Sequence, residues 1–151
     1  WKLMLTETLI SLFERDLNRV LKELQLYKDE IDIWRIEKEI ANSAGNLVLH
    51  LIGNLNTYIG NEIGKTGYVR NRELEFSLKD IPRDELIAQL VNTSDVIKNS
   101  LSLLTADDYE MEYPMLVLSE KTTTGFFMVH LLGHLNYHLG QINYHRRLIE
   151  K

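Results

Sequence analysis

Cysteine is absent from this 151-residue chain, and its absence excludes several kinds of chemistry. Without cysteine the protein has no disulfide, no thiolate-bound zinc and no thiol nucleophile of its own. Any sulfur chemistry therefore needs a thiol that arrives on a small molecule.

Proline and long apolar runs are also scarce. There are only two prolines and no glycine-rich or Ser/Pro-rich stretch, so we see no linker and expect one domain over residues 1–151. No run approaches the ~20 apolar residues that cross a bilayer, and the amino terminus lacks the basic and then apolar pattern of a signal peptide. We therefore expect a cytoplasmic protein with no membrane contact. Because the chain begins at Trp1 instead of Met, we expect a few residues to precede it.

Positive charge is in the minority, with 17 Lys and Arg against 22 Asp and Glu and a net charge of −5. Proteins that bind nucleic acids usually present a basic face to the phosphate backbone. No run of Lys or Arg supplies such a face here. A nucleic-acid partner is therefore not expected.

Apolar residues at helical spacing are what the chain has in abundance. Leu5, Leu9, Leu12 and Leu17 are typical, since they recur near every third or fourth position with charged residues between them. The pattern predicts an all-α fold, a four-helix bundle. Its helices are expected over residues 1–27, 42–62, 82–105 and 123–151. Two long connections, residues 64–81 and 107–121, join them, and connections of that length are often functional.

Two segments leave alternatives open. Residues 28–40 continue the first helix or form a short loop, with Trp34 closing over one end of the core. Residues 115–118 (MLVL) form a short strand or a loop that plugs the bundle. In the first connection, Arg70, Arg72 and Glu73 are expected to form surface ion pairs rather than to reach an anionic substrate.

The last predicted helix carries four of the five histidines. His130, His134 and His138 are spaced four apart and drift by only about 40° per step, so they form a stripe on one face. Two imidazoles one turn apart reach a single metal ion at about 2 Å. His145 lies about three turns beyond His134 and is expected to be exposed near the helix end.

An earlier segment supplies a third candidate ligand, His50. Residues 50–60 (HLIGNLNTYIG) align without gaps on residues 130–140 (HLLGHLNYHLG), with His, Leu, Gly, Leu, Asn and Gly shared. We expect these two helices to pack together with their glycines at close approach and their polar stripes facing inward. The polar stripe of the earlier helix consists of Ser43, Asn46, His50, Asn54 and Thr57.

Three neutral imidazoles from His50, His134 and His138 leave coordination positions open, as in catalytic metal centres. Nitrogen ligands suit Zn, Ni, Fe or Cu. His130 is the rival ligand, or a residue that orients one. The alternative is that these are core histidines, hydrogen-bonded to neighbouring polar side chains.

The same segments resemble a known family. HLIGNL around His50, HLNYHLGQI at residues 134–142 and NSAGNL at residues 42–47 are similar to motifs of the DinB-like superfamily. The resemblance covers nearly the whole chain. It implies a four-helix bundle with up-down-down-up connectivity and a divalent metal site formed by His50, His134 and His138 rather than by His130. Some members are metal-dependent transferases that use a small cellular thiol and others are regarded as hydrolases, so the resemblance implies a site without choosing a reaction.

The sequence leaves two alternative functions open. The first is an enzyme whose divalent transition metal (Zn, Ni or Fe) activates water or a low-molecular-weight thiol for attack on an electrophilic small-molecule substrate. Its ligands or substrate would be oriented by His130, Gln141, Asn54 and Tyr58. The alternative is a non-enzymatic metal-binding or structural bundle that forms a homodimer. No Gly-x-Ser-x-Gly or paired Glu-x-x-His motif occurs, which argues against a serine hydrolase and a di-iron carboxylate bundle.

Overall fold

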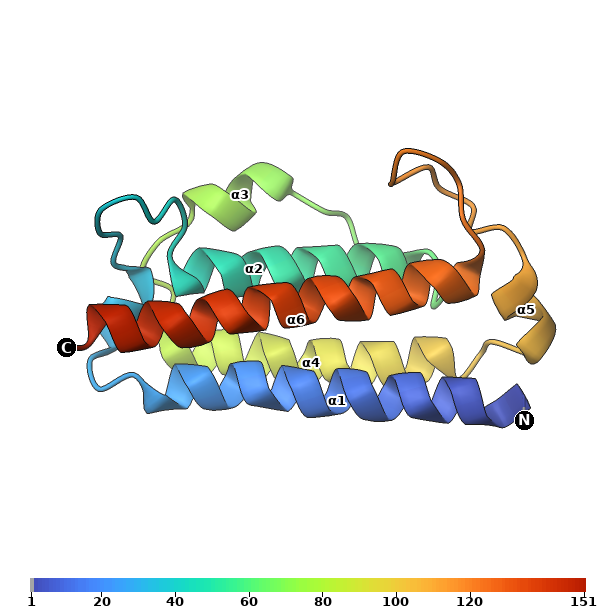
Figure 1. Cartoon of the computed structure of the whole chain (residues 1–151), viewed down its shortest axis with the longest axis horizontal. Coiled ribbons are helices and arrows are strands. Elements are labelled where there is room, and N and C mark those ends of the chain that lie inside the picture. Colours follow the sequence, from blue (N-terminus) through green and yellow to red (C-terminus); the bar gives the residue numbers. More distant parts are fainter. Residues whose placement is uncertain (1) are drawn as a thin grey trace.

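Four long helices lie side by side in the computed structural model, which describes residues 2–151, with side chains from residue 5 onward. They are α1 (Lys2–Leu26), α2 (Ala44–Leu55), α4 (Arg83–Leu101) and α6 (Thr124–Ile149). α1 and α6 run in one direction and α2 and α4 in the other (Figure 1). Residues 2–151 contain no strand, only an isolated bridge between Glu112 and Thr123, so the all-α prediction is confirmed.

The shorter elements lie in the connections between these helices. They are the 3₁₀ turn η1 (Glu30–Trp34), the π-helical turn η2 (Asn56–Asn61), and the helices α3 (Arg72–Ser77) and α5 (Ala106–Glu110). α3 and α5 are absent from the sequence prediction, which treated both connections as irregular. Within the described chain no helix has the combination of length and apolar content that crossing a bilayer requires.

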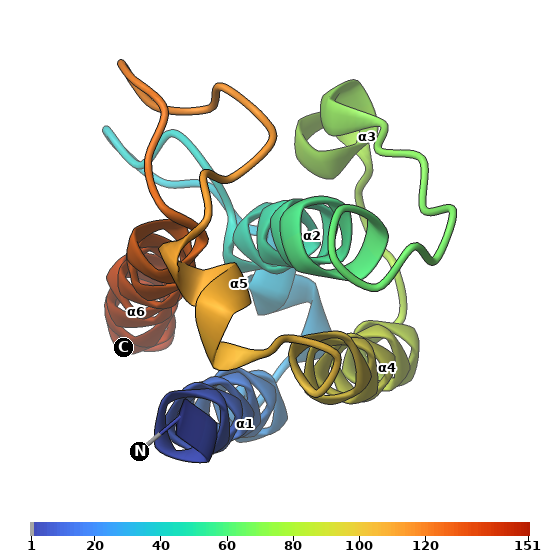
Figure 2. The same cartoon turned by 90° about the vertical axis from the view of Figure 1, so that its right-hand side faces the viewer.

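Apolar side chains from all four long helices meet along a common core. α1 packs against α4 and α6, and α2 packs against the same two helices, so the four occupy the corners of a square seen end-on (Figure 2). Phe13 of α1, Leu51 of α2 and Leu86 of α4 are completely buried. Each such side chain contributes about 1.5–3 kcal/mol by leaving water.

Local signals in the sequence place the helix ends. The Ser43 hydroxyl accepts a hydrogen bond from the Asn46 amide at 3.2 Å and caps α2, whose helical path continues through η2 to Asn61. Pro82 precedes α4, which ends at Leu101 rather than at the predicted residue 105. Trp34 is buried against Gly45 at one end of the core, as predicted.

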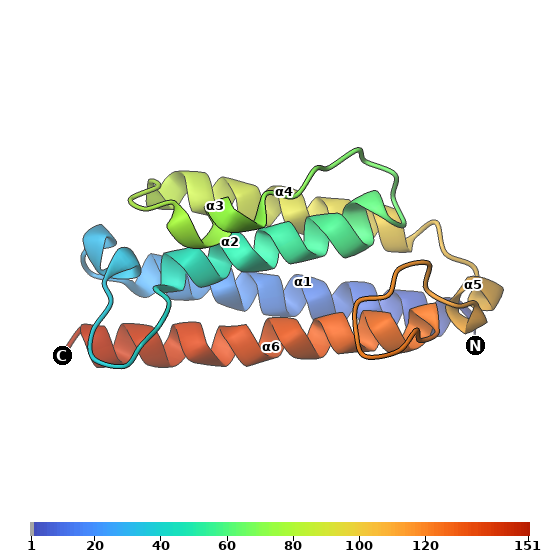
Figure 3. The ribbon, with the colours of Figure 1, turned by 90° about the horizontal axis from the view of Figure 1, so that it is seen from above.

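The segment at residues 115–118 corrects one prediction. It forms neither a strand nor a plug, because Met115, Leu116 and Val117 are 38%, 64% and 36% exposed. The connection stands out from the body of the molecule at the start of α6 (Figure 1), and seen from above it lies over that helix (Figure 3). Met115, Leu116 and Val117 therefore contribute little to the core, and of this segment only Leu118 is partly buried against it.

The expected close approach of glycines between α2 and α6 is wrong. Gly133 and Gly140 of α6 face open space, since no atom of the part of the chain that the structure describes lies within 4 Å of a Cβ placed there. Gly53 of α2 instead lies beneath the Glu75 carboxylate of α3, and Gly60 of η2 lies against Val96 of α4. Gly53 and Gly60 thus make room for α3 and α4, and Gly133 and Gly140 lie on the outer surface.

Candidate metal centre

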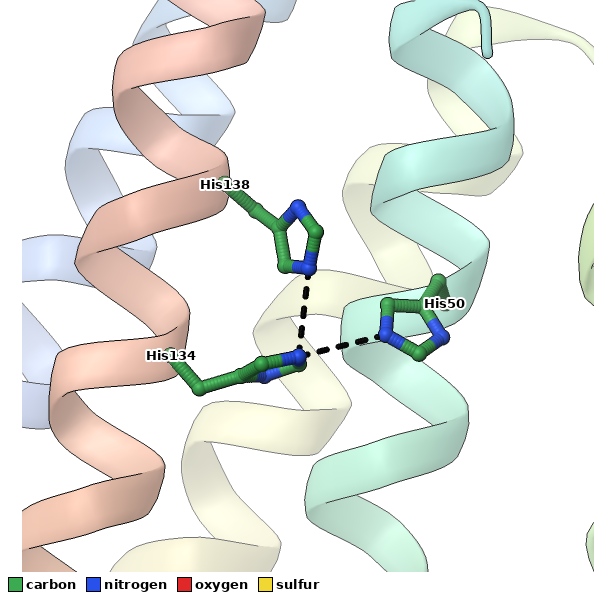
Figure 4. Close-up of side chains that lie close together, drawn as sticks. All are labelled: His50, His134 and His138. Carbon is green, nitrogen blue, oxygen red and sulfur yellow. Dashed lines mark hydrogen bonds between the residues drawn. The ribbon is translucent and has the colours of Figure 1, made fainter. Parts of the chain in front are cut away.

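Three histidine rings meet between α2 and α6 (Figure 4). The Nε2 atom of His134 lies 3.3 Å from Nε2 of His50 and 3.1 Å from Nε2 of His138. One ring nitrogen from each histidine lies within 4.8 Å of the other two, a grouping that can hold a metal ion. The structure therefore brings together the three histidines that the sequence singled out.

A carboxylate sets the proton position on His50. Oε1 of Glu75 lies 3.1 Å from Nδ1 of His50, and Arg70 donates two hydrogen bonds to the same carboxylate at 2.7 and 2.9 Å. Burial alone would raise the pKa of Glu75, but the hydrogen bonds from His50 and Arg70 outweigh burial and lower it. The ionised carboxylate can only accept, so Nδ1 of His50 carries the hydrogen and Nε2 carries a lone pair.

Gln141 sets the proton position on His138 in the same way. Nδ1 of His138 donates to the Gln141 side-chain oxygen at 2.7 Å, which leaves a lone pair on Nε2. Two lone pairs therefore face His134, whose Nε2 can donate a hydrogen to only one of them. A cation at the meeting point satisfies every lone pair at once, so this donor set fits a metal.

Burial keeps the His134 and His138 rings in the neutral form that binds metals. The pKa of His134 is lowered to about 4, first by burial and then by its neighbours His138 and His50. Burial also lowers the pKa of His138. At neutral pH both imidazoles are unprotonated, so a metal ion does not have to displace a proton from them.

Comparison with known proteins assigns this chain to a family. Residues 5–151 match the family described as protein of unknown function, DUF1572. The chain belongs to the DUF1572 family. The match spans all three histidines. A search of the curated proteins finds no match.

The other candidate residues of this DUF1572 protein lie around the group without joining it. His130 is exposed and stacks on Phe127, with ring centroids 5.7 Å apart, so it lies outside the three-nitrogen group. Tyr58 packs edge-on against Phe127 and lies 5.8 Å below the Arg70 guanidinium. Asn54 is buried, and its amide oxygen has no hydrogen-bond partner among the described residues.

His145 corrects a prediction, because it is 3% exposed rather than free at the helix end. Its Nε2 donates to the backbone oxygen of Arg35 at 2.8 Å, and its Nδ1 accepts from the Tyr27 hydroxyl at 2.6 Å. Its face of α6 is covered by the end of α1 and by the segment after η1. His145 therefore fastens that segment to α6.

Sequence reasoning did not find Glu75. Residues 64–81 show no extended periodicity, since α3 has only six residues. The available signal was Asn71, whose side chain caps α3 by accepting from the Leu74 amide. Asn46 then holds α3 on α2, because its amide donates to the backbone oxygens of Glu75 and Leu78, both at 2.9 Å.

Proposed function

We propose that this DUF1572 protein is a metal-dependent enzyme of the DinB-like type, with His50, His134 and His138 as ligands of one divalent transition metal such as Zn, Ni or Fe. The observation that carries the proposal is the convergence of three Nε2 atoms, two of which present lone pairs to the third ring. α1 and α6 run in one direction and α2 and α4 run in the opposite direction, which supports the up-down-down-up connectivity of that superfamily (Figure 1).

The ligand number favours a catalytic role over a structural one. Structural zinc sites are closed by four protein ligands, whereas catalytic sites keep at least one position for water or substrate. Here three side chains converge. The apolar core that the four long helices share also gives the fold a source of stability independent of a metal.

Two side chains of the protein, Glu75 and Gln141, orient two of the proposed histidine ligands. Glu75, held by Arg70, keeps the Nδ1 hydrogen on His50, and Gln141 does the same for His138. The unpaired amide oxygen of Asn54, one turn after His50, supports a role in holding a substrate or a water molecule near the site. When bound, a divalent metal supplies Lewis acidity that lowers the pKa of a water or small-molecule thiol ligand, which suits hydrolase or thiol S-transferase chemistry.

Metal stoichiometry tests the proposal. The protein purified without chelator should contain about one transition-metal ion per chain by elemental mass spectrometry. His138→Ala should lose most of it, whereas His130→Ala, an exposed histidine two turns earlier on α6, should retain it. Wild-type metal content in His138→Ala would remove the basis of the proposal.

Metal removal separates the enzyme from a structural bundle. A chelator should strip the ion and leave the far-ultraviolet circular dichroism of the protein nearly unchanged, because an open site is not required for folding. Loss of helical signal on chelation would instead assign the metal to the fold.

A further inference from the structure

A cleft opens beside the three-histidine group, between α6 and the segment that joins η1 to α2. Its volume is about 550 Å³, within the range of about 300–1,000 Å³ found for small-molecule sites. His138 and Gln141 line the cleft and are joined to each other by the 2.7 Å hydrogen bond at the metal centre. The cleft therefore adjoins the group where chemistry is proposed.

Apolar and aromatic side chains form most of the lining. Tyr137 and Tyr144 of α6 are 65% and 63% exposed on one wall, next to Leu148. Ile40 and Leu47 lie on the opposite wall. A ligand that covers these surfaces removes apolar area from water, which is the main driving force for binding in such sites.

The charges around the cleft do not suit an anion. Glu39 is the one ionised side chain among its described lining residues. Arg147 does not line it, and its guanidinium lies over the Tyr144 ring at 5.5 Å. Arg70 is committed to Glu75. Away from the three histidines, an anionic group inside the cleft would meet the Glu39 carboxylate and no cationic side chain among the lining residues.

Hydrogen bonds fasten the wall of the cleft that faces α6. His145 lines the cleft and bonds the backbone oxygen of Arg35, which precedes the wall formed by residues 39–42. Ser43 caps α2, where that wall ends. Because both ends are fastened, little conformational entropy is lost when a ligand enters.

We propose that this cleft binds the uncharged aromatic or aliphatic body of the substrate and directs its reactive group to the three histidines. The inference rests on the proposed function, because the cleft is assigned as the approach to that site. Tyr137, Tyr144 and Leu148 provide the apolar contact, and the side-chain amide group of Gln141 is placed to donate a hydrogen bond to a polar atom of the substrate.

Two fluorescent probes with the same aromatic body test the assignment. Phenyl-naphthylamine is uncharged, and anilinonaphthalene sulfonate carries one added sulfonate. The uncharged probe should bind saturably at one site per chain, and the sulfonate should bind at least about tenfold more weakly, because its charge is placed beside Glu39. Equal binding of the two probes, or no saturable binding of the uncharged one, would overturn the inference.

A matched pair of variants locates the probe. Leu148→Arg puts a charge in the cleft. Leu116→Arg makes the same change at a leucine in the connection before α6. Leu148 is 49% exposed and Leu116 is 64% exposed, so both variants should fold. Leu148→Arg should weaken binding of the uncharged probe at least about tenfold and Leu116→Arg less than about twofold. Equal weakening would contradict the cleft assignment.

Metal content and light scattering on the same samples separate the remaining outcomes. Probe binding retained without any bound metal would refute the proposed function and leave the cleft intact. Metal bound at the histidines without probe binding would refute the cleft alone. A wild-type dimer that becomes monomeric in Leu148→Arg, with no probe binding, would show that a second copy covers this face and would overturn the inference.

Discussion

Glu75→Gln removes the charge that orients His50 while keeping the size of the side chain. In the native protein the carboxylate receives two hydrogen bonds from Arg70, at 2.7 and 2.9 Å, and one from His50 at 3.1 Å. A glutamine has one acceptor oxygen, so its NH₂ group must face one of these donors. If it faces His50, the ring hydrogen moves to Nε2 and the lone pair aimed at the metal position is lost.

The expected loss follows from the burial of this contact. Replacing a group that orients a metal-bound histidine lowers metal affinity by about 10–100-fold, or about 1.4–2.7 kcal/mol. We expect the upper half of that range, because Glu75 is 5% exposed and solvent cannot replace the lost acceptor. The assay is competition for Zn²⁺ against a chromophoric chelator, with circular dichroism to show that the helices remain.

Glu73→Gln is the matched control, since it makes the same change two residues earlier on α3 at an exposed position. It should leave the Zn²⁺ affinity within about twofold of the wild type. Wild-type affinity in Glu75→Gln, or an equal loss in both variants, would refute the orienting role of the carboxylate.

Three further predictions concern stability. The metal-free protein should lose stability as the pH falls from 6.5 toward 4, because the folded-state pKa of His134 is lowered to about 4 and the unfolded chain takes up a proton that the folded chain does not; urea midpoints that stay constant over this window would contradict it. Tyr27→Phe should cost about 1–3 kcal/mol in denaturant titrations, because it leaves the buried Nδ1 of His145 without a donor, and an unchanged midpoint would disprove that role. Gly133→Ala should stabilise α6 by about 0.5–1 kcal/mol, because the surroundings of Gly133 are open. Gly53→Ala should instead destabilise the fold, because the new Cβ would collide with the Glu75 carboxylate. Similar effects of the two changes on the free energy of unfolding would contradict this packing.

The helices and the histidine group were accessible from the sequence because both depend on short-range periodicity. His134 and His138 are one turn apart, which puts them on one face of any helix. The similarity of residues 50–60 to residues 130–140 then pointed to His50. Ser43 and Pro82 marked the starts of two helices because capping and the missing proline N–H act locally.

The missed features depend on contacts between segments far apart in the chain. Glu75 reaches His50 only because Asn46 holds α3 on α2 and Gly53 leaves space beneath the carboxylate. His145 is buried because the segment after η1 folds back over the end of α6. Neither contact leaves a periodic pattern in the residues that make it.

Anomalous diffraction from crystals of the protein grown without chelator tests the central claim most directly. Data collected on both sides of a transition-metal absorption edge should show one peak between α2 and α6, about 2 Å from Nε2 of each of His50, His134 and His138. The absence of a peak there, with the three rings bonded only to one another or turned apart, would contradict a metal centre at this site.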